Sequence, residues 1–429
     1  MSLAGMNELA LGIDLGTSGI RSAVIDKGGE VIATARGGYG PQNPDKIDAQ
    51  IWWAGVQNCL VMQMTSLRAA GHNPTEIVRI GVDGTSGSMV LMDSALTPVT
   101  RALMYNSSGF EKEAAQIAGH APEPHIARGA GSALARMLRL QSEDTDRHAV
   151  HLAHQADFIL AKLMGLGGIS DHNNALKTGY DPEKERWPEW AKAAGVRVDL
   201  FPQVHAAGAP LFVVCDEVAE QFGLLPTAVV HSGTTDSVAA FLAGAPLEEG
   251  AAVTSLGTTL AIKLLSPVRI DAPEVGLYSH YVGGHWLVGG ASNTGGGVLK
   301  NYFSDSDLIK LSSQIDPEQP SGLDYYPLSR LGERFPINDP TFRPILLPRP
   351  TSDVEFLHGL FEGMARIEAR CYAEMAKRGA SMPTVILTAG GGAKNRVWST
   401  IRQRVLGVEV RAAPNSEAAV GVGKLLSTI

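Results

Sequence analysis

The chain has 429 residues, of which 44% are hydrophobic, 19% charged and 6% aromatic. At roughly 150 residues per domain this length predicts two or three domains, and the composition excludes a small disulfide scaffold and a disordered chain. Lys and Arg number 36 against 44 Asp and Glu, a formal net charge of −8. No basic block stands out, so we expect a small-molecule partner and no nucleic acid.

The cysteine pattern bears on the cellular compartment. Cys59, Cys215 and Cys371 are an odd number at wide spacing, which supports neither a disulfide framework nor a zinc site and fits a reducing cytoplasm. No apolar run reaches the roughly 18 residues of a membrane span, and the N-terminus lacks a basic segment followed by an apolar one. We therefore expect a cytoplasmic protein with no membrane partner.

The N-terminal part of the chain alternates between predicted strands and a helix. Strand-like runs lie at 9–14, 20–25, 30–36, 78–83 and 89–93, and a helical stretch covers about 51–70. The first three runs are separated by short glycine-containing turns, which predicts an antiparallel meander. Alternating strands and helices indicate the α/β class.

The middle of the chain differs from its two flanks. Residues 111–194 have mostly helical periodicity, which predicts a helical insert or cap. Strand-like patterns restart at 228–231 and continue at 253–256 and 260–265. The sequence therefore predicts two domains, residues 1–225 and 226–429.

A short motif occurs once in each half. Asp14-Leu-Gly-Thr-Ser18 and Ser255-Leu-Gly-Thr-Thr259 each follow a predicted strand. Such a turn exposes backbone N–H groups and hydroxyls that suit phosphate oxygens, although a single one is also what any hairpin needs. Two in matched positions favour an internal duplication around a shared cleft.

Two aspartates end apolar strands. A carboxylate at Asp14 needs a partner, which Mg²⁺ on a bound nucleotide would supply. Asp236 precedes a predicted helix. It is either a helix cap or a base that accepts a proton from a substrate hydroxyl.

Glycine-rich and small polar segments mark further candidate contacts. Gly390, Gly391 and Gly392 follow a strand and open a helix, so a flat ligand can approach the backbone, yet the pattern matches neither Gly-x-Gly-x-x-Gly nor Walker A. The run 289–297 leads into another helix, with tight packing on the sheet as the alternative explanation. Segments 83–88 and 104–106 suit a hydroxyl-rich ligand, or are plain turns.

With these residues in view, the chain from about Leu9 to Leu426 resembles the FGGY carbohydrate kinases. The segments that carry the resemblance are Gly12–Arg21 (first phosphate motif), Ser255–Thr259 (second phosphate motif), Ala389–Asn395 (adenosine motif), Gly233–Asp236 (catalytic aspartate), His154–Phe158, Ser170–Ala175 and Glu417–Gly423. The resemblance implies an α/β fold of two actin-like, ribonuclease H-like domains facing a central cleft for ATP and sugar. It also implies Mg²⁺ and transfer of the γ-phosphate of ATP to a sugar hydroxyl.

The resemblance further implies roles for individual residues. Asp236 is the expected catalytic residue, and Asp14 and Asp236 are the expected metal contacts. The expected nucleotide-binding residues are Asp14, Gly16, Thr17, Ser18, Arg21, Gly257, Thr258, Thr259, Gly296, Gly390, Gly391, Gly392 and Asn395. The expected substrate-binding residues are Asp14, Thr85, Ser86, Gly87, Asn106, Asn173 and Asp236.

Two segments of the sequence narrow the choice of acceptor sugar. Asp83–Met89 and Ala102–Asn106 look most like D-ribulose kinase-type and xylulose kinase-like members, whereas xylulokinases proper usually show Gln-Met-His-Gly and Trp-x-Asp there. We therefore expect a ketopentose acceptor, best D-ribulose, giving D-ribulose 5-phosphate. D-xylulose, another ketose, a polyol, a silent actin-like ATP-binding protein and a homodimer surface all remain open.

Overall fold

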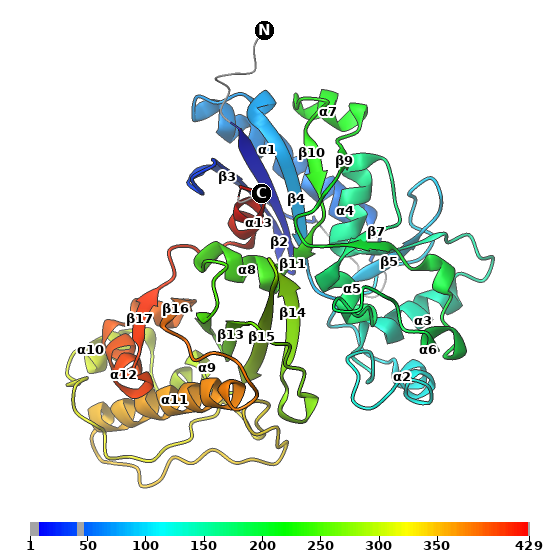
Figure 1. Cartoon of the computed structure of the whole chain (residues 1–429). Coiled ribbons are helices and arrows are strands. Elements are labelled where there is room, and N and C mark those ends of the chain that lie inside the picture. The colour runs from blue at the N-terminus through cyan, green and yellow to red at the C-terminus, as the bar shows by residue number, and fades with distance from the viewer. Residues whose placement is uncertain (1–7, 41–46, 428–429) are drawn as a thin grey trace. The chain divides into compact units, whose positions relative to one another are not determined.

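The computed structural model describes residues 8–40 and 47–427. It divides into two compact units (Figure 1). The first unit contains the chain up to Ala243 and again from Glu417 onward, and the second unit is Gly244–Ser416. Each unit is built around one large sheet.

The sheet of the first unit has the order β3-β2-β1-β4-β10-β9, with β11 also beside β4. Its strands are β1 (Leu9–Gly16), β2 (Gly19–Ile25), β3 (Val31–Gly37), β4 (Ile77–Gly84), β9 (Pro210–Val213), β10 (Val229–His231) and β11 (Thr234–Thr235). The first three strands form the antiparallel meander that the sequence predicts. Strand β4 lies parallel to β1, and β10 and β11 lie parallel to β4.

Three helices complete the sheet layer of the first unit. They are α1 (Gln50–Ala69), α8 (Asp236–Gly244) and α13 (Ala418–Ser427). Helix α13 packs against β1, β2 and β4. The contact is close because β1 carries glycine there: a Cβ on Gly12 would lie 2.0 Å from the carbonyl oxygen of Ala419.

These contacts correct the expected domain boundary at residue 225. Strands β10 and β11 bond to β4, and α13 covers the same sheet. Residues 226–243 and those from Glu417 onward therefore belong to the first unit, not to the second. The sequence pattern could not reveal this, because it marks where strands restart but not which sheet they join.

The remaining elements of the first unit are mostly helical. Some of them surround a separate hydrophobic core that includes Met89, Phe110 and Leu134, whereas residues 155–164 and 216–222 pack on the core of the large sheet. The helices are α2 (Glu111–Ala118), α3 (Ala133–Glu143), α4 (Gln155–Met164), α5 (His172–Thr178), α6 (Trp190–Ala193) and α7 (Asp216–Phe222). Two small ladders join β5 (Met89–Met92) to β6 (His151–His154) and β7 (Ile169–Asp171) to β8 (Gln203–His205). Helices are found as predicted, whereas helical periodicity alone missed β6 and β7.

The second unit repeats the strand arrangement of the first. Its sheet order is β14-β15-β13-β12-β16-β17. The strands are β12 (Ala251–Leu256), β13 (Leu260–Ser266), β14 (Tyr278–Val282), β15 (His285–Ser292), β16 (Val385–Ala389) and β17 (Glu409–Ala412). As with β1, β2 and β4, β12 pairs antiparallel with the next strand along the chain and parallel with a later one. Helices α9 (Gly296–Lys300), α10 (Asp305–Ser312), α11 (Asp353–Ala376) and α12 (Arg396–Leu406) complete the unit.

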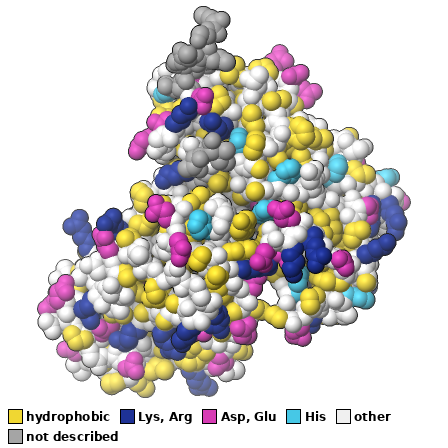
Figure 2. Space-filling view, in the orientation of Figure 1, with side chains coloured by type: hydrophobic (Ala, Val, Ile, Leu, Met, Phe, Trp, Pro, Cys, Tyr) yellow, Lys and Arg dark blue, Asp and Glu magenta, His cyan; other side chains and the backbone are white. Residues whose placement is uncertain are grey.

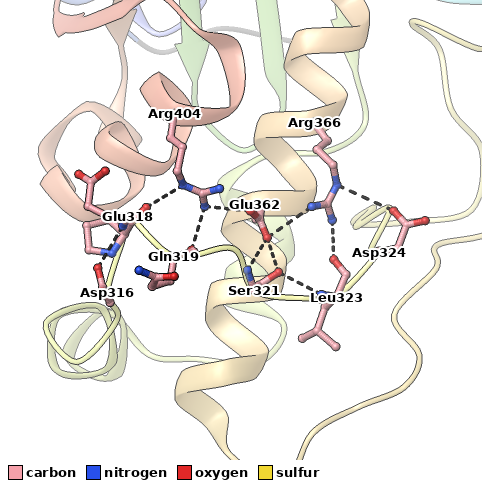
Figure 3. Close-up of polar contacts among 10 residues, drawn as sticks. Asp316, Glu318, Gln319, Ser321, Leu323, Asp324, Glu362, Arg366 and Arg404 are labelled. Carbon is pink, nitrogen blue, oxygen red and sulfur yellow. Dashed lines mark hydrogen bonds and ion pairs between the residues drawn. The ribbon is translucent and has the colours of Figure 1, made fainter.

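A long irregular connection joins α10 to α11, and Figure 3 shows how it is anchored. Glu362 of α11 accepts hydrogen bonds from Arg404 of α12 at 2.8 Å and from the backbone N–H of Ser321 at 2.8 Å. Arg366 lies 3.4 Å from the same carboxylate and donates to the carbonyl of Leu323 at 2.6 Å. Burial alone would raise the pKa of Glu362, but the donors at Ser321 and Arg404 outweigh it and the pKa is lowered.

A buried ion pair ties two helices of the second unit to its sheet. Arg402 of α12 donates to both carboxylate oxygens of Glu368 of α11, each at 2.7 Å, and to Thr388 of β16 at 2.7 Å. Thr254 of β12 donates to the same carboxylate at 2.5 Å. All four side chains are buried.

We expect Glu368→Ala to destabilise the second unit by about 3–5 kcal/mol, because it leaves the Arg402 guanidinium buried without its counter-charge. Chemical denaturation followed by circular dichroism measures the loss. Lys377→Ala is the matched control at the C-terminal cap of α11, since Lys377 is exposed and forms an ion pair with Glu374 at 3.2 Å, and such pairs contribute little. Equal stability of the two variants would contradict the prediction.

Candidate active site

Three aspartates lie at the ends of neighbouring strands in the first unit. Asp14 of β1 is paired in parallel register with Asp83 of β4. Thr234 of β11 is paired with the same Asp83, and Asp236 follows two residues later as the first residue of α8. Asp14 and Asp236 are the sequence-predicted residues. Asp83 was predicted only as the start of a polar turn, although it ends an apolar strand just as Asp14 does.

Burial makes the carboxyl groups of Asp14 and Asp83 costly to ionise. Burial raises the pKa of Asp14, and an ion pair with Arg21 at 3.1 Å offsets this in part. Arg21 also lies 3.3 Å from Glu417. The pKa of Asp83 is raised well above its ordinary value, by burial first and then by the nearby carboxylates of Asp14 and Asp236. Apart from a hydrogen bond shared with the Asp14 carboxyl, neither oxygen of Asp83 has a hydrogen-bond partner among the described residues.

The donor set fits a magnesium ion held on a nucleotide better than a self-contained metal centre. Within residues 8–40 and 47–427, no group of three or more His, Cys, Asp or Glu side chains could hold a metal ion. Mg²⁺ usually takes one or two protein carboxylates and completes its shell with water and substrate phosphates. The carboxyl groups of Asp14 and Asp83 match that requirement.

The turn between β1 and β2 presents exposed hydroxyls. Thr17 and Ser18 are exposed, and Thr17 donates to the hydroxyl of Tyr105 at 3.3 Å. Gly16 is held from behind by Tyr39, whose hydroxyl donates to its carbonyl at 2.7 Å. The backbone of the turn is therefore fixed while its side chains remain accessible, as a phosphate contact requires.

The loop from Asp83 to Ser88 is held by Gln155 at the start of α4. Gln155 accepts hydrogen bonds from the backbone N–H and the hydroxyl of Thr85, at 3.0 and 2.6 Å. The Thr85 hydroxyl also bonds Ser88 at 2.6 Å, so Thr85 holds the loop together from within. The hydroxyl of Ser86 is buried and has no hydrogen-bond partner in the described part of the chain, which makes it the better candidate for a ligand contact.

Two further residues complete the surroundings of this loop. Arg136 of α3 is buried and donates to the carbonyl of Gly87 at 3.0 Å and to that of Gly131 at 3.0 Å. Burial lowers the pKa of Arg136 to about 10. Asn106 lies in an exposed stretch after Tyr105, whose N–H donates to Ser88 at 2.9 Å. Sequence reasoning missed Arg136 because no motif marks it, and Gln155 because it was read only as part of a family segment.

Asn173 and Asp236 differ in accessibility. Asn173 is fully buried on α5, and its amide donates to the hydroxyl of Thr234 at 3.1 Å. Asp236 is half-buried, and its carboxylate accepts the backbone N–H of Ser237 at 2.6 Å. The helix-cap and functional interpretations of Asp236 are therefore compatible.

In the second unit, the turn of Gly257, Thr258 and Thr259 joins β12 to β13. The N–H of Gly296 donates to the carbonyl of Gly257 at 2.8 Å, and that of Gly297 to the carbonyl of Thr258 at 3.0 Å. A Cβ on Gly296 would lie 2.8 Å from the oxygen of Gly257. Tight packing thus accounts for Gly296, which supports the turn from behind.

The glycine run after β16 has one open position. Gly390 has φ +83°, which favours glycine, and a Cβ there would meet the oxygen of Leu256 at 2.7 Å. Gly392 packs on Leu256, whereas no atom lies within 4 Å of a Cβ on Gly391. Asn395 caps α12 by accepting the N–H of Trp398 at 3.0 Å and donates to Ser312 at 2.9 Å. Gly391 is therefore the residue of this run most open to a ligand.

Comparison with known families agrees with this geometry. Residues 9–243 match the N-terminal domain of the FGGY family of carbohydrate kinases, and residues 252–427 match the C-terminal domain of that family. The chain belongs to the FGGY family and is a carbohydrate kinase, a phosphotransferase that acts on a sugar hydroxyl. The family boundary at 243 agrees with the point where the chain first leaves the first unit, whereas residues 417–427 match the C-terminal domain of the family and lie in the first unit.

Individual relatives cover nearly the whole chain. The xylulose kinase of Escherichia coli K12 is 22% identical over 97% of this chain and 89% of its own length. The solved xylulose kinase of Rhodospirillum rubrum superposes with a TM-score of 0.82 at 20% identity, covering 97% of this chain and 89% of that one. The Plasmodium falciparum glycerol kinase with ADP gives a TM-score of 0.82 at 16% identity over 98% and 90%. The chain therefore has the two-domain α/β fold of these solved kinases.

Membrane spans, cysteines and surface charge were further expectations from the sequence. In the part of the chain that is described, the helices are too short or too polar to cross a membrane. The three cysteines are free thiols. On the face shown in Figure 2, basic and acidic side chains are intermixed. A cytoplasmic location and a homodimer stay predictions.

Proposed function

We propose that the protein transfers the γ-phosphoryl group of ATP to a terminal hydroxyl of a ketopentose, with D-ribulose as the best acceptor and D-ribulose 5-phosphate as the product. One observation carries the proposal: Asp14, Asp83 and Asp236 end adjoining strands, directly beside the polar loop of residues 83–88. A phosphoryl acceptor needs a base or positioning group next to the nucleotide phosphates.

Each part of the site has a role in this reaction. Asp236 accepts the proton of the attacking hydroxyl, and positioning matters more than base strength in a loose transition state. Asp14 would hold Mg²⁺ directly or through water. When bound, that ion neutralises charge on the β- and γ-phosphates. In the first unit the proposed phosphate contacts are Gly16, Thr17, Ser18 and Arg21. In the second unit the proposed phosphate contacts are Gly257, Thr258 and Thr259, and the proposed adenosine contacts are Gly390, Gly391, Gly392 and Asn395.

The acceptor contacts support a polyhydroxylated sugar. The Ser86 hydroxyl has no hydrogen-bond partner among the described residues, and Gly87 and Asn106 are further proposed acceptor contacts. The segment Asp83-Gly-Thr-Ser-Gly87 is the feature that favours D-ribulose. D-xylulose is the second candidate, because the relatives described above include xylulose kinases.

The test is coupled ADP production from ATP and Mg²⁺ with D-ribulose, D-xylulose, L-ribulose, glycerol and a blank without sugar. We expect the highest kcat/KM with D-ribulose and loss of turnover when EDTA removes divalent cations. A higher kcat/KM with D-xylulose would replace the proposed acceptor. A panel no faster than the blank would contradict a ketopentose kinase and favour the silent ATP-binding alternative.

A further inference from the structure

The strand that leads to Asp236 is unusually short. Strand β11 has only two residues, Thr234 and Thr235, which pair with Asp83 and Gly84 of β4. The preceding Gly233 lets the chain lie close to β4, since a Cβ there would be 2.4 Å from the carbonyl oxygen of Val82. Two ladder positions are little support for a segment that must fix the direction of the next side chain.

Helix α5 provides further hydrogen bonds to strand β11. The amide of Asn173 donates to the hydroxyl of Thr234 at 3.1 Å, and the amide of Asn174 donates to the backbone carbonyl of Thr234 at 3.1 Å. Asn173 and Asn174 therefore hold Thr234 by hydrogen bonds to its side chain and to its backbone.

The asparagines are themselves held in place. Asp171 caps α5 by accepting the N–H groups of Asn173 and Asn174 at 2.8 and 3.1 Å, and it accepts the Asn174 amide at 2.6 Å. Asp171, Asn173, Asn174 and Thr234 are each 0% exposed. Buried hydrogen bonds of this kind favour one geometry, because any other leaves polar groups unpaired without access to water.

The position of Thr234 connects this network to the chemistry. Thr234 lies two residues before Asp236, the first residue of α8, so holding Thr234 in place fixes where the chain enters that helix and where the Asp236 side chain begins. The hydroxyl of Thr234 already accepts a hydrogen bond from the Asn173 amide. The Thr234 hydroxyl is therefore engaged within the protein, and we expect it to influence the reaction through Asp236 without contacting the reacting atoms.

We propose that Thr234 is a positioning residue for Asp236, and that Asn173 acts on the reaction through Thr234 and not by binding the acceptor. The inference rests on the proposed function, in which Asp236 receives the proton of the acceptor hydroxyl. In this proposal, the asparagines of α5 orient the Asp236 carboxylate by holding Thr234.

A double-mutant cycle tests the inference. Thr234→Val keeps the branched shape but removes the hydroxyl, which leaves the Asn173 amide without this acceptor. We expect kcat with the best sugar to fall about 10–100-fold while KM for ATP stays within about twofold. In an Asp236→Ala background the same change is expected to alter kcat by less than about twofold, because the residue to be aimed is absent.

Controls separate positioning from a general loss of structure. Thr65→Val is the matched control, since Thr65 is exposed on α1 and its hydroxyl donates to the carbonyl of Val61 within its own helix; its kcat should equal that of the wild type. Thr234→Ser restores the hydroxyl and should recover most of kcat. Thermal unfolding is recorded for every variant, and if Thr234→Val fails to fold, Asn173→Ala takes its place in both backgrounds.

The outcomes distinguish this inference from the proposed function. An equal loss of kcat in the wild-type and Asp236→Ala backgrounds, or an unchanged kcat in Thr234→Val, would overturn the positioning role. A rise in KM for the sugar with unchanged kcat in Asn173→Ala would instead make Asn173 an acceptor contact. If Asp236→Ala alone leaves kcat unchanged, the proposed function of Asp236 fails, and the inference fails with it.

Discussion

Replacing Asp236 with alanine is expected to lower kcat by about 10²–10⁴, a rise of roughly 3–5 kcal/mol in the barrier. The physical reason is the loss of the group that receives the proton as the acceptor oxygen attacks. KM for ATP should change little, because the adenosine motif lies in the second unit and Asp236 in the first. Steady-state kinetics with the best sugar of the panel measures both quantities.

A second substitution separates the base from the helix cap. Asp236→Asn keeps an oxygen that can accept the N–H of Ser237 but cannot take up a proton, so it should be about as impaired as alanine. Asp216→Asn is the matched control, since Asp216 is an exposed acidic residue in the first turn of α7. Near wild-type turnover in Asp236→Asn would remove Asp236 from its catalytic role.

Gly421→Val is expected to prevent the first unit from folding stably. A Cβ on Gly421 of α13 would lie 1.7 Å from the carbonyl oxygen of Ala239 in α8 and 2.6 Å from its carbonyl carbon. The obstacle is backbone on both helices, so it cannot be relieved by a rotamer change. Overpacking usually costs about 1–3 kcal/mol, and we expect more than about 4 kcal/mol here because two helices and the sheet beneath them must separate.

Differential scanning calorimetry of the whole chain checks this prediction. For a unit of this size, a loss of about 4 kcal/mol corresponds to a fall in Tm of roughly 8–16 °C. Gly38→Ala is the matched control in the same unit, because no atom lies within 4 Å of a Cβ at that position. A Tm of Gly421→Val equal to that of the control would show that α13 does not rest on α8 as described.

The features that the sequence could predict are those encoded by neighbouring residues. The meander from Leu9 to Gly37 is marked by apolar runs and glycine turns, and the repeat of Gly-Thr turns after Asp14 and Ser255 identified the two sheets. The segments that resemble the kinase family gave the reaction class, which family comparison confirmed. Local patterns and short motifs carried this information because they need no knowledge of distant contacts.

What the sequence could not predict depends on contacts between distant segments. Asp83 gains its importance from its register with Asp14 and Thr234, which only the assembled sheet reveals. Gln155 and Arg136 act on a loop about 70 and 49 residues before them in the chain. Asn173 was predicted to bind substrate from its motif, whereas its burial and its bond to Thr234 became visible only with α5 packed on β11.

The chain leaves the first unit at Ala243 and returns to it at Glu417. This arrangement determines which insertions, exchanges and truncations of the coding sequence keep a unit intact. The second unit is an inserted module whose two ends are neighbours, since a Cβ on Gly244 would lie 3.0 Å from the carbonyl oxygen of Asn415. A segment of codons for 244–416 therefore encodes one whole unit, which could be exchanged between homologues at two adjacent junctions. A stop codon shortly before Glu417 would spare that unit and remove α13 from the other, so the most C-terminal lesions damage the fold that begins at the N-terminus.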